Sequence, residues 1–497
     1  MTLDSPSAGP ASAILPLATG HIPDDFVPRF HEGFIVDRCD DAGNPGGPHV
    51  ILLHPTRAAW AVTNETGLML SGLCDGTRTV VQIATELAAL YALPDAAPVA
   101  ADVKAFLADA LKALLLEQAP DGSQPQPVGP APVTVNHPRY TRELALFLTE
   151  ECNLRCKHCF VVEGKMPSDS LSRHEVAKLV EEHVRLNPVT SVTFSGGEIS
   201  LVPDWLDMVE HACQRANHVL VCTNALLLTE ADARRLAASG AMVQVSLDGP
   251  DPEIHDYVRG KGSFAKTWAA IEMLAGIKPS MVALSCTLTR SVLGHVEALV
   301  EAASRAGVSV VRFIPLLRQR AALTHWDVMA PDPQEVMATY RFLMFELPRR
   351  RPAGATSIKC GFPGFVPNLH PDGAWCPLGR MTLIDSRGSA YNCPSMNIPE
   401  YRVGSIRENS LEELQQGARN EELRRKVVER RWTVPECAAC AWRNFCQGSC
   451  TALSYMRTNE FYATDEYCDF RRELYRRNAL AKAGLISDRP TDQAASC

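Results

Sequence analysis

Three cysteines stand close together directly after a run of apolar residues. Cys152, Cys156 and Cys159 follow the spacing C-x3-C-x2-C, and the preceding run 142–148 is predicted to be a buried strand. A cubane iron–sulfur cluster is normally held by four cysteine thiolates. Three thiolates leave one iron open to a ligand from outside the protein, and an open iron indicates chemistry rather than a purely structural cluster.

A structural zinc site is the alternative interpretation of the same cysteines. Zinc knots usually have four closed ligands in paired C-x2-C or Cys/His form, and His158 is the residue that would complete one here. No matching pair stands near Cys156 and Cys159. The spacing therefore favours an iron–sulfur cluster over zinc.

The composition is that of an ordinary globular protein. The 497 residues are 46% hydrophobic and 21% charged, a length that corresponds to about three domains. The formal net charge of -8 argues against a general nucleic-acid binder, because phosphate recognition depends on clustered Lys and Arg. Residues 1–20 lack the basic segment of a secretory signal, and no apolar run approaches the roughly 20 residues of a membrane span. We expect a cytoplasmic protein with no nucleic-acid and no membrane partner.

A segment rich in proline, from 119 to 138, marks the clearest boundary in the chain. Such a segment packs neither as helix nor as strand and is predicted to be an extended linker. The predicted parts are an N-terminal tail (1–26), an independent domain (27–118), the linker (119–138), an α/β domain (139–330), a bridging region (331–359), a cysteine-rich domain (360–475) and a C-terminal tail (476–497).

The domain at 27–118 is predicted to have three strands followed by three helices, as in a small winged-helix fold. The predicted strands are 33–38, 49–54 and 59–63, and the predicted helices are 66–73, 80–91 and 101–117.

The segments 60–67 (WAVTNETG) and 74–79 (CDGTRT) resemble the precursor-peptide recognition element of ribosomal-peptide (RiPP) maturation systems, which is related to the pyrroloquinoline quinone peptide chaperone. The resemblance implies that a leader peptide adds as a strand to the edge of the sheet. A DNA-reading winged helix and a structural cap are the alternatives, and the scarcity of Lys and Arg weighs against the first.

Residues 139–330 alternate strands with amphipathic helices. Six predicted strands occupy 142–148, 191–194, 218–222, 242–246, 281–286 and 310–314. This alternation predicts a parallel sheet, and ligands of such folds gather at the carboxyl ends of the strands.

The segment Ser195-Gly196-Gly197-Glu198 follows the second of these strands. With the cysteine loop, it resembles the GGE-type motif of the radical S-adenosylmethionine (SAM) enzymes. The resemblance implies a partial (β/α)6 barrel in which the open iron binds SAM, and one electron cleaves SAM to a 5'-deoxyadenosyl radical. The implied SAM contacts are Gly196, Gly197, Glu198, Asn224, Ser246, Asp248 and Arg259. Turn formation and helix capping are the alternative account of polar residues at strand ends.

A second cysteine array occupies 360–475. It comprises Cys376, Gly388, Cys393, Cys437-x2-Cys440-x5-Cys446-x3-Cys450 and Cys468. The array resembles the SPASM domain, which implies two auxiliary 4Fe-4S clusters. The implied ligand sets are Cys360, Cys376, Cys393 and Cys450 for the first, and Cys437, Cys440, Cys446 and Cys468 for the second.

The assignment of Cys450 to the first auxiliary cluster comes from the resemblance, because spacing alone would group it with Cys437, Cys440 and Cys446. A pair of structural zinc sites is the alternative. It is less favoured, because this spacing does not form two C-x2-C pairs.

These features together predict a radical SAM maturase with SAM and three 4Fe-4S clusters as cofactors. Its expected partners are a precursor peptide bound through its leader and an electron donor such as flavodoxin or ferredoxin. An oxidative carbon–carbon or thioether crosslink is the expected product. A sulfatase-type formylglycine maturase, a peptide epimerase or decarboxylase, and a non-catalytic iron–sulfur regulator are the alternatives. No residue stands out as a general base or hydrogen donor.

Overall fold

The computed structural model describes residues 22–31, 33–39, 49–117, 140–161, 170–352, 354–361, 369, 376, 378 and 381–486. The chain divides into two compact units, residues 1–131 with 483–485 and residues 132–482 with 486–497. Each unit is described by itself. The predicted linker at 119–138 lies outside the described residues. None of the described helices combines the length and hydropathy that a membrane span requires.

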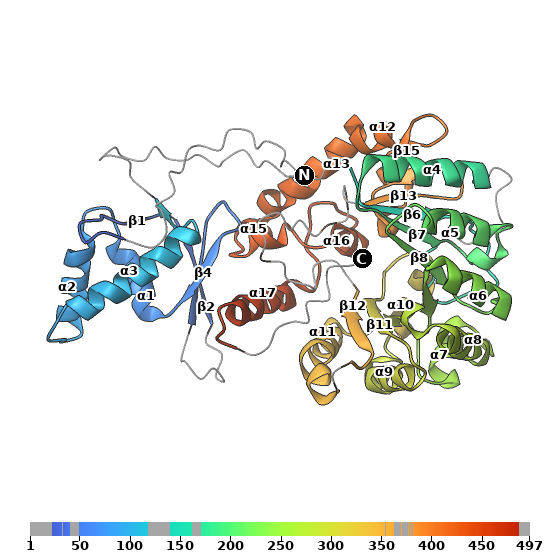
Figure 1. The fold of residues 1–497 in the computed structure, drawn as a ribbon, viewed down its shortest axis with the longest axis horizontal. Helices are drawn as coiled ribbons and strands as arrows, with labels where there is room; N and C mark the ends of the chain where they lie inside the picture. The colour runs from blue at the N-terminus through green and yellow to red at the C-terminus, as the bar shows by residue number, and fades with distance from the viewer. Residues whose placement is uncertain are drawn as a thin grey trace, which may run out of the picture. The chain divides into compact units, whose positions relative to one another are not determined.

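The N-terminal unit contains the predicted three strands and three helices, drawn in blue in Figure 1. The strands β2 (Ile35–Cys39), β3 (His49–Leu53) and β4 (Trp60–Thr63) form an antiparallel sheet in the order β2-β3-β4. The helices are α1 (Glu65–Leu73), α2 (Val80–Leu90) and α3 (Ala97–Lys112). A short pair, β1 (Arg29–Phe30) and β5 (Leu116–Glu117), was not predicted, because two residues carry no strand pattern.

Local sequence signals and one apolar core account for this unit. Thr79 and Gln82 form a capping box that starts α2, since each side chain accepts a hydrogen bond from the other residue's N–H. Strand β3 is buried along its whole length. Its residues share a core with Ile83 of α2 and Leu107 of α3. The two outer strands, β2 and β4, each pair with β3 alone among the described strands.

The second unit contains the six predicted parallel strands, which lie side by side in chain order (Figure 1). They are β6 (Glu143–Phe147), β7 (Ser191–Ser195), β8 (His218–Thr223), β9 (Met242–Ser246), β10 (Val282–Leu288) and β11 (Val310–Pro315). The helices between them are α4 (Arg173–Leu186), α5 (Trp205–Cys213), α6 (Glu230–Ser239), α7 (Pro252–Arg259), α8 (Ser263–Ile277) and α9 (Val296–Arg305). The prediction of a parallel α/β sheet is confirmed.

Four further strands widen this sheet to ten. Strand β12 (Ser357–Cys360) runs parallel to β11 at one end, and β13 (Met381–Ile384) runs parallel to β6 at the other. Strands β14 (Ser389–Tyr391) and β15 (Gly404–Ser405) continue beyond β13 as an antiparallel meander. The cysteine-rich segment is therefore part of the same sheet as the barrel strands.

The rest of this unit is mostly helical. Its helices are α10 (Ala321–Met329), α11 (Pro333–Arg341), α12 (Leu411–Gln416), α13 (Ala418–Thr433), α14 (Pro435–Ala438), α15 (Arg443–Cys446), α16 (Thr451–Thr458) and α17 (Cys468–Lys482). Helix α17 passes the predicted domain end at 475.

The parallel strands have two different faces. Phe194, Val221 and Val243 are fully buried and belong to the core that the strands share with the helices. Their neighbours along the strands, such as Thr193 and Gln244, are partly exposed. Successive side chains of a strand point to opposite faces. The second set therefore forms an inner face that points away from the helix-packed core and is rich in polar residues.

Candidate functional site

The loop with the first three cysteines begins just after β6, at the carboxyl end of that strand. The three thiols are partly exposed, and that of Cys159 raises the pKa of both Cys152 and Cys156. Burial is the larger cause, and it raises the pKa of Cys156 to about 11. A thiol with such a pKa loses its proton at neutral pH only when a metal takes its place. The three thiols thus fit the thiolate donor set of an iron–sulfur cluster.

Hydrogen-bond donors surround the sulfurs of this loop. The N–H of Leu154 lies 3.4 Å from the sulfur of Cys152, and the amide of Asn224 lies 3.9 Å from it. Asn224 also donates to Asn153 Oδ1 at 2.7 Å. Hydrogen bonds to cluster sulfurs tune the reduction potential. Asn224, a predicted SAM contact, therefore lies beside the cysteine loop.

A fully buried carboxylate ties the loop to the barrel. Asp248 Oδ2 accepts from Arg259 Nε at 2.5 Å and from His158 Nε2 at 2.6 Å, and Oδ1 accepts from the N–H of Thr287 at 2.8 Å. Burial would raise the pKa of Asp248, but Arg259 and His158 hold it well below its usual range. His158, considered above as a zinc ligand, is engaged in this network.

Arg259 extends the network to the sulfur of Cys156, which lies 3.9 Å from its Nη1. Burial would lower the pKa of Arg259, but Asp248 keeps it above its usual range, so the guanidinium stays charged. Asp248 and Arg259, two of the predicted SAM contacts, are thereby joined to each other and to the cysteine loop.

Gly196 and Gly197 let the end of β7 approach the backbone of the cysteine loop. A Cβ at Gly196 would lie 2.6 Å from Thr149 O, and a Cβ at Gly197 would lie 2.1 Å from Glu151 O. The N–H of Gly197 donates to Thr149 O at 2.7 Å. The glycines are therefore required for packing within the protein, and their predicted contact with SAM stays a prediction.

Glu198 anchors the end of β8 rather than facing solvent. It is 1% exposed, and its carboxylate accepts from Thr223 Oγ1 at 2.6 Å and from the N–H of Asn224 at 2.7 Å. Ser246, at the end of β9, pairs with Ser285 in the sheet and is partly exposed. Ser246 thus has a place on the inner face at the carboxyl ends of the strands.

The later cysteines gather into two groups. Cys376 and Cys393 both raise the pKa of Cys450, and Cys376 lies 3.3 Å from the hydroxyl of Thr451. Burial raises the pKa of Cys437 to about 12, and Cys446, Cys468 and Cys440 raise it further. Cys450 therefore lies with Cys376 and Cys393, although spacing alone would have placed it with the other group.

Cys360 is not linked to either group by an effect on its pKa. It closes β12, and burial alone raises the pKa of its thiol, with no contribution from another of the described cysteines. Burial is the main cause that raises the pKa of Tyr340, and the charge of Cys360 raises it further. Among the described residues, no three His, Cys, Asp or Glu side chains converge as a single metal ion requires.

Two buried arginines support the later cysteines, and the spacing of the cysteines gave no sign of either. Arg430 is fully buried and donates to the carbonyls of Gly448, Phe461 and Ala463. Arg471 forms a bidentate pair with Asp465 at 2.6 and 2.7 Å. Gly388 has a φ of 80° in the turn between β13 and β14, a conformation that favours glycine.

Comparison with known families gives three matches along the chain. Residues 49–116 match the coenzyme PQQ synthesis protein D (PqqD) family, residues 146–303 match the radical SAM superfamily, and residues 376–441 match the SPASM iron–sulfur cluster-binding domain.

Curated proteins similar to this chain include maturases and heme synthases. The mycofactocin maturase MftC of Mycobacterium ulcerans is 29% identical over 332 residues, which cover 65% of this chain and 86% of that protein. The AdoMet-dependent heme synthase of Methanosarcina barkeri is 24% identical over 353 residues, covering 66% and 97%.

Solved structures show the same fold. The structure of Streptococcus suis SuiB bound to precursor peptide SuiA aligns with a TM-score of 0.56 at 14% identity, covering 89% of this chain and 99% of that chain. The structure of native anSMEcpe with bound AdoMet aligns with a TM-score of 0.54 at 20% identity, covering 69% and 98%. The three matched domains and the similarity to the mycofactocin maturases support a radical SAM/SPASM peptide maturase with an N-terminal recognition element.

Proposed function

We propose that this chain binds the leader of a ribosomally synthesised precursor peptide and forms an oxidative carbon–carbon or thioether crosslink in its core. The observation that carries the proposal is the group of three partly exposed cysteines at the carboxyl end of β6, on the same chain as a PqqD-type domain. The first feature supplies radical chemistry, and the second supplies peptide binding.

The cysteine loop is the proposed site of SAM cleavage. Cys152, Cys156 and Cys159 hold the radical SAM cluster, which supplies the electron that releases the 5'-deoxyadenosyl radical. Asp248, Arg259 and His158 fix the position of the loop, and Arg259 places a positive charge beside Cys156. The residues proposed to contact SAM are those that the resemblance implies: Gly196, Gly197, Glu198, Asn224, Ser246, Asp248 and Arg259.

The later cysteines are the proposed ligands of two auxiliary 4Fe-4S clusters. The first set is Cys360, Cys376, Cys393 and Cys450, and the second is Cys437, Cys440, Cys446 and Cys468. Burial is the main cause that raises the pKa of Cys393 and of Cys450, but Cys376 raises both further and Cys393 raises that of Cys450, which supports grouping these three members of the first set. A crosslink removes two hydrogens from the peptide. One leaves as an atom to the 5'-deoxyadenosyl radical and the other as a proton, and an auxiliary cluster would supply the acceptor for the remaining electron. A flavodoxin or ferredoxin is the proposed electron donor for SAM cleavage.

The N-terminal unit is the proposed leader-binding module. Its outer strands β2 and β4 each pair with β3 alone among the described strands, so each has an edge where a peptide strand can add. Tethering the peptide to the chain that carries the catalyst raises its local concentration to roughly millimolar.

Anaerobic incubation of the reconstituted protein with SAM and a reductant tests the enzymatic part of the proposal. We expect 5'-deoxyadenosine to form. A protein with full iron content that releases none would contradict radical chemistry and favour a non-catalytic regulator. Iron analysis of the same sample also tests the zinc alternative.

Coexpression with short peptides encoded nearby tests the product. A crosslink predicts a peptide lighter by two hydrogens, with tandem mass spectra that lack fragments between the linked residues. An unchanged mass would indicate epimerisation, and a loss of carbon dioxide would indicate decarboxylation. An aldehyde that reacts with hydrazine reagents would indicate formylglycine. Deletion of residues 1–118 is expected to abolish modification, and full turnover without them would favour a sulfatase-type maturase.

A further inference from the structure

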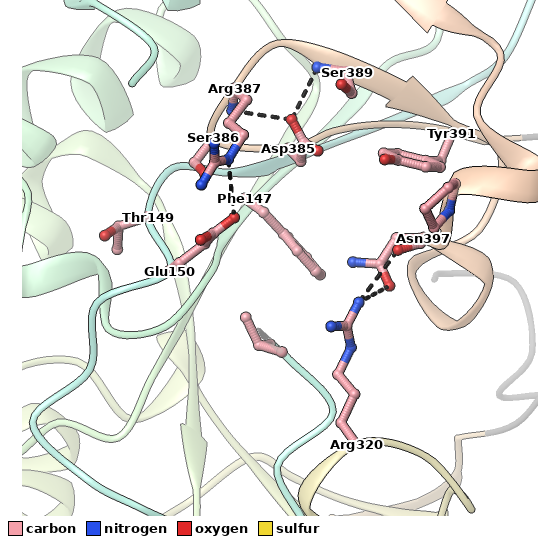
Figure 2. A pocket seen from close by; sticks show the side chains of 12 residues that line it. Phe147, Thr149, Glu150, Arg320, Asp385, Ser386, Arg387, Ser389, Tyr391 and Asn397 are labelled. Carbon is pink, nitrogen blue, oxygen red and sulfur yellow. Dashed lines mark hydrogen bonds and ion pairs between the residues drawn. The ribbon is translucent and has the colours of Figure 1, made fainter. Parts of the chain in front are cut away.

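A cavity of about 300 Å³ lies next to the cysteine loop (Figure 2). One wall comes from Phe147, Thr149 and Glu150, which precede Cys152, and from Val161, which follows Cys159. The opposite wall comes from the turn between β13 and β14 and from Asn397, close after Cys393. The cavity therefore lies between the segments that carry the first three cysteines and one of the later cysteines.

Strand register places this cavity on the inner face of the sheet. Phe147 pairs with Ser195, and Ala145 pairs with Thr193. Paired residues of neighbouring strands point to the same face, so Phe147 shares the face of these partly exposed polar residues. Phe147, Val161 and Tyr391 belong to one apolar cluster. They give the cavity an apolar lining.

Arg320 brings a cation to this cavity without a carboxylate partner among the described residues. Its Nη2 donates to the carbonyl of Asn397 at 3.2 Å and to Asn397 Oδ1 at 3.3 Å, and both acceptors are neutral (Figure 2). Its Nε is buried and has no hydrogen-bond partner among the residues that the structure describes. The other arginine of the lining, Arg387, forms an ion pair with Glu150 at 3.6 Å. Among the described residues that line the cavity, Arg320 is thus the arginine whose charge is left for a ligand.

Two further observations point to a ligand at the same place. Ser386 lines the cavity and is 1% exposed, and its hydroxyl has no hydrogen-bond partner in the described part of the chain. Buried polar groups in native proteins normally have a partner. Arg320 also has a φ of 50° and a ψ of -125°, a rare backbone for a residue other than glycine. Strained residues of this kind cluster at ligand-binding positions.

We propose that the cavity binds a carboxylate of the core peptide, with Arg320 as its cationic partner and Ser386 as a second donor. The proposal rests on the proposed function, because it takes the ligand to be the peptide that the chain modifies. A guanidinium matches a carboxylate in charge and in the geometry of its donors. The apolar lining suits a neighbouring hydrophobic residue. The carboxylate comes either from the peptide C-terminus or from an Asp or Glu side chain.

Binding of three short probes to the reconstituted, SAM-bound protein tests this inference by calorimetry. The probes are N-acetyl-glycyl-phenylalanine, its C-terminal amide, and N-acetyl-phenylalanyl-glutamic acid α-amide. We expect at least one carboxylate probe to bind about tenfold more tightly than the neutral amide, as hydrogen bonds to charged groups allow. The stronger of the two carboxylate probes identifies the source, and either preference supports the proposal.

Variants of Arg320 and Ser386 then locate the binding site. Arg320→Gln is expected to remove the preference for carboxylate, Arg320→Lys to retain part of it, and Ser386→Ala to weaken it several-fold. Arg318 is exposed on the same segment and stacks on Trp326, so Arg318→Gln is the matched control and is expected to change neither probe binding nor SAM cleavage.

Three results would overturn the carboxylate site. They are equal affinity for the acid and the amide, an undiminished preference in Arg320→Gln, and failure of all probes to bind at millimolar concentration. The formation of 5'-deoxyadenosine by the wild type is measured separately. If the wild type formed no 5'-deoxyadenosine but still preferred the carboxylate probes, the proposed reaction would be contradicted and the proposed binding site would be supported.

Discussion

The two cysteine regions of this chain protect their sulfurs to different degrees. Cys152, Cys156 and Cys159 are partly exposed in a single loop. In the later region Cys376, Cys393, Cys437 and Cys450 are buried, while Cys360, Cys440, Cys446 and Cys468 are partly exposed, and these cysteines come from segments far apart in the sequence. An iron that binds an external molecule must be reachable, whereas a cluster that only passes electrons can be sealed from solvent. The burial of Cys376, Cys393 and Cys450 therefore matches the electron-carrying role proposed for the first auxiliary set.

Both regions nevertheless use a buried ion pair beside their thiols. Asp248 pairs with Arg259 in the first, and Asp465 pairs with Arg471 in the second. Burial raises the pKa of Cys156 and of Cys446, and the charges of Arg259 and Arg471 offset part of this rise. Burial of two charges has a desolvation cost, so such a pair is weak evidence for stability. We infer that these pairs fix position and offset the negative charge of the clusters.

Removal of the cysteines is expected to give the largest effect and to separate the two regions. A variant with alanine at 152, 156 and 159 should form no 5'-deoxyadenosine, because no thiolates remain to hold the radical SAM cluster. Cys393→Ala should still form it but yield no crosslinked peptide. Liquid chromatography measures the first product and mass spectrometry the second. Each variant should lose about four of about twelve irons per chain.

The assignment of roles would fail in two ways. Formation of 5'-deoxyadenosine by the triple variant would show that the loop is not the cleavage site. Full crosslinking by Cys393→Ala would show that the first auxiliary cluster is not needed as an electron acceptor.

Removing one charge from the buried pair near the radical loop is expected to give the next largest effect. Asp248→Asn leaves Arg259 buried without a counter-charge, which costs about 3 to 5 kcal/mol. We expect a lower unfolding midpoint and loss of iron from the radical site, measured by calorimetry and iron analysis. Asp207→Asn is the matched control. Its carboxylate pairs with arginines at the surface, where ion pairs contribute about 1 kcal/mol or less.

Asp465→Asn makes the same change in the other region. It is expected to remove iron from the auxiliary clusters while SAM cleavage continues. If both substitutions had the same effect on SAM cleavage, the two regions would not be independent.

Gly197→Ala adds a methyl group beside the loop with Cys152, Cys156 and Cys159. It is expected to disturb that loop alone and to lower the free energy of unfolding less than Asp248→Asn does. The added Cβ would lie 2.1 Å from Glu151 O, and both atoms belong to backbone segments that cannot simply turn aside. We expect Gly197→Ala to cost about 1 to 3 kcal/mol and to weaken SAM binding, measured by calorimetry. Gly294→Ala is the control, because no atom lies within 4 Å of its Cβ. Unchanged SAM affinity in Gly197→Ala would show that the loop tolerates displacement.

Sequence patterns predicted the parts of the fold that are set locally. The six barrel strands appear as separate apolar runs, and α2 has a capping box in the sequence itself. Strands β12 and β13 are four residues each and carry no such pattern. Strand β13 belongs to the sheet because Met381 pairs with Glu143, a partner from the other end of the domain. A contact of that kind depends on the whole fold.

The same limit applies to the candidate site. The spacing of the first three cysteines indicated their common loop, and the position of Asp248 after a strand indicated a functional residue. The sequence did not indicate that Asp248 would bind Arg259 and His158, because α7 must first bring Arg259 back to the end of β9. Arg320 gave no signal at all, since its role follows from the neutral partners and the cavity around it.

Lowering the pH is expected to give the smallest effect. It should act on the region of the first three cysteines, because His255 contacts Asp248 there. His255 is fully buried, and its Nδ1 accepts from the N–H of Asp248 at 3.2 Å. Burial is the main cause that lowers its pKa to about 4. The unfolded chain therefore binds a proton near pH 6.5 while the folded chain stays neutral. Stability is complete above pH 6.5 and falls toward pH 4, by about 1.4 kcal/mol for each pH unit.

His255→Asn keeps a neutral acceptor for the N–H of Asp248 and has no proton to gain. The decline of the free energy of unfolding between pH 6.5 and 5.5 should be shallower in this variant by about 1 kcal/mol, measured by urea titration at each pH. His174→Asn, at an exposed position of α4, should leave the decline unchanged. If the free energy of unfolding declined equally with pH in wild type and His255→Asn, protonation of His255 would not weaken the contacts of Asp248. The acid sensitivity would then not be specific to the region of the first three cysteines.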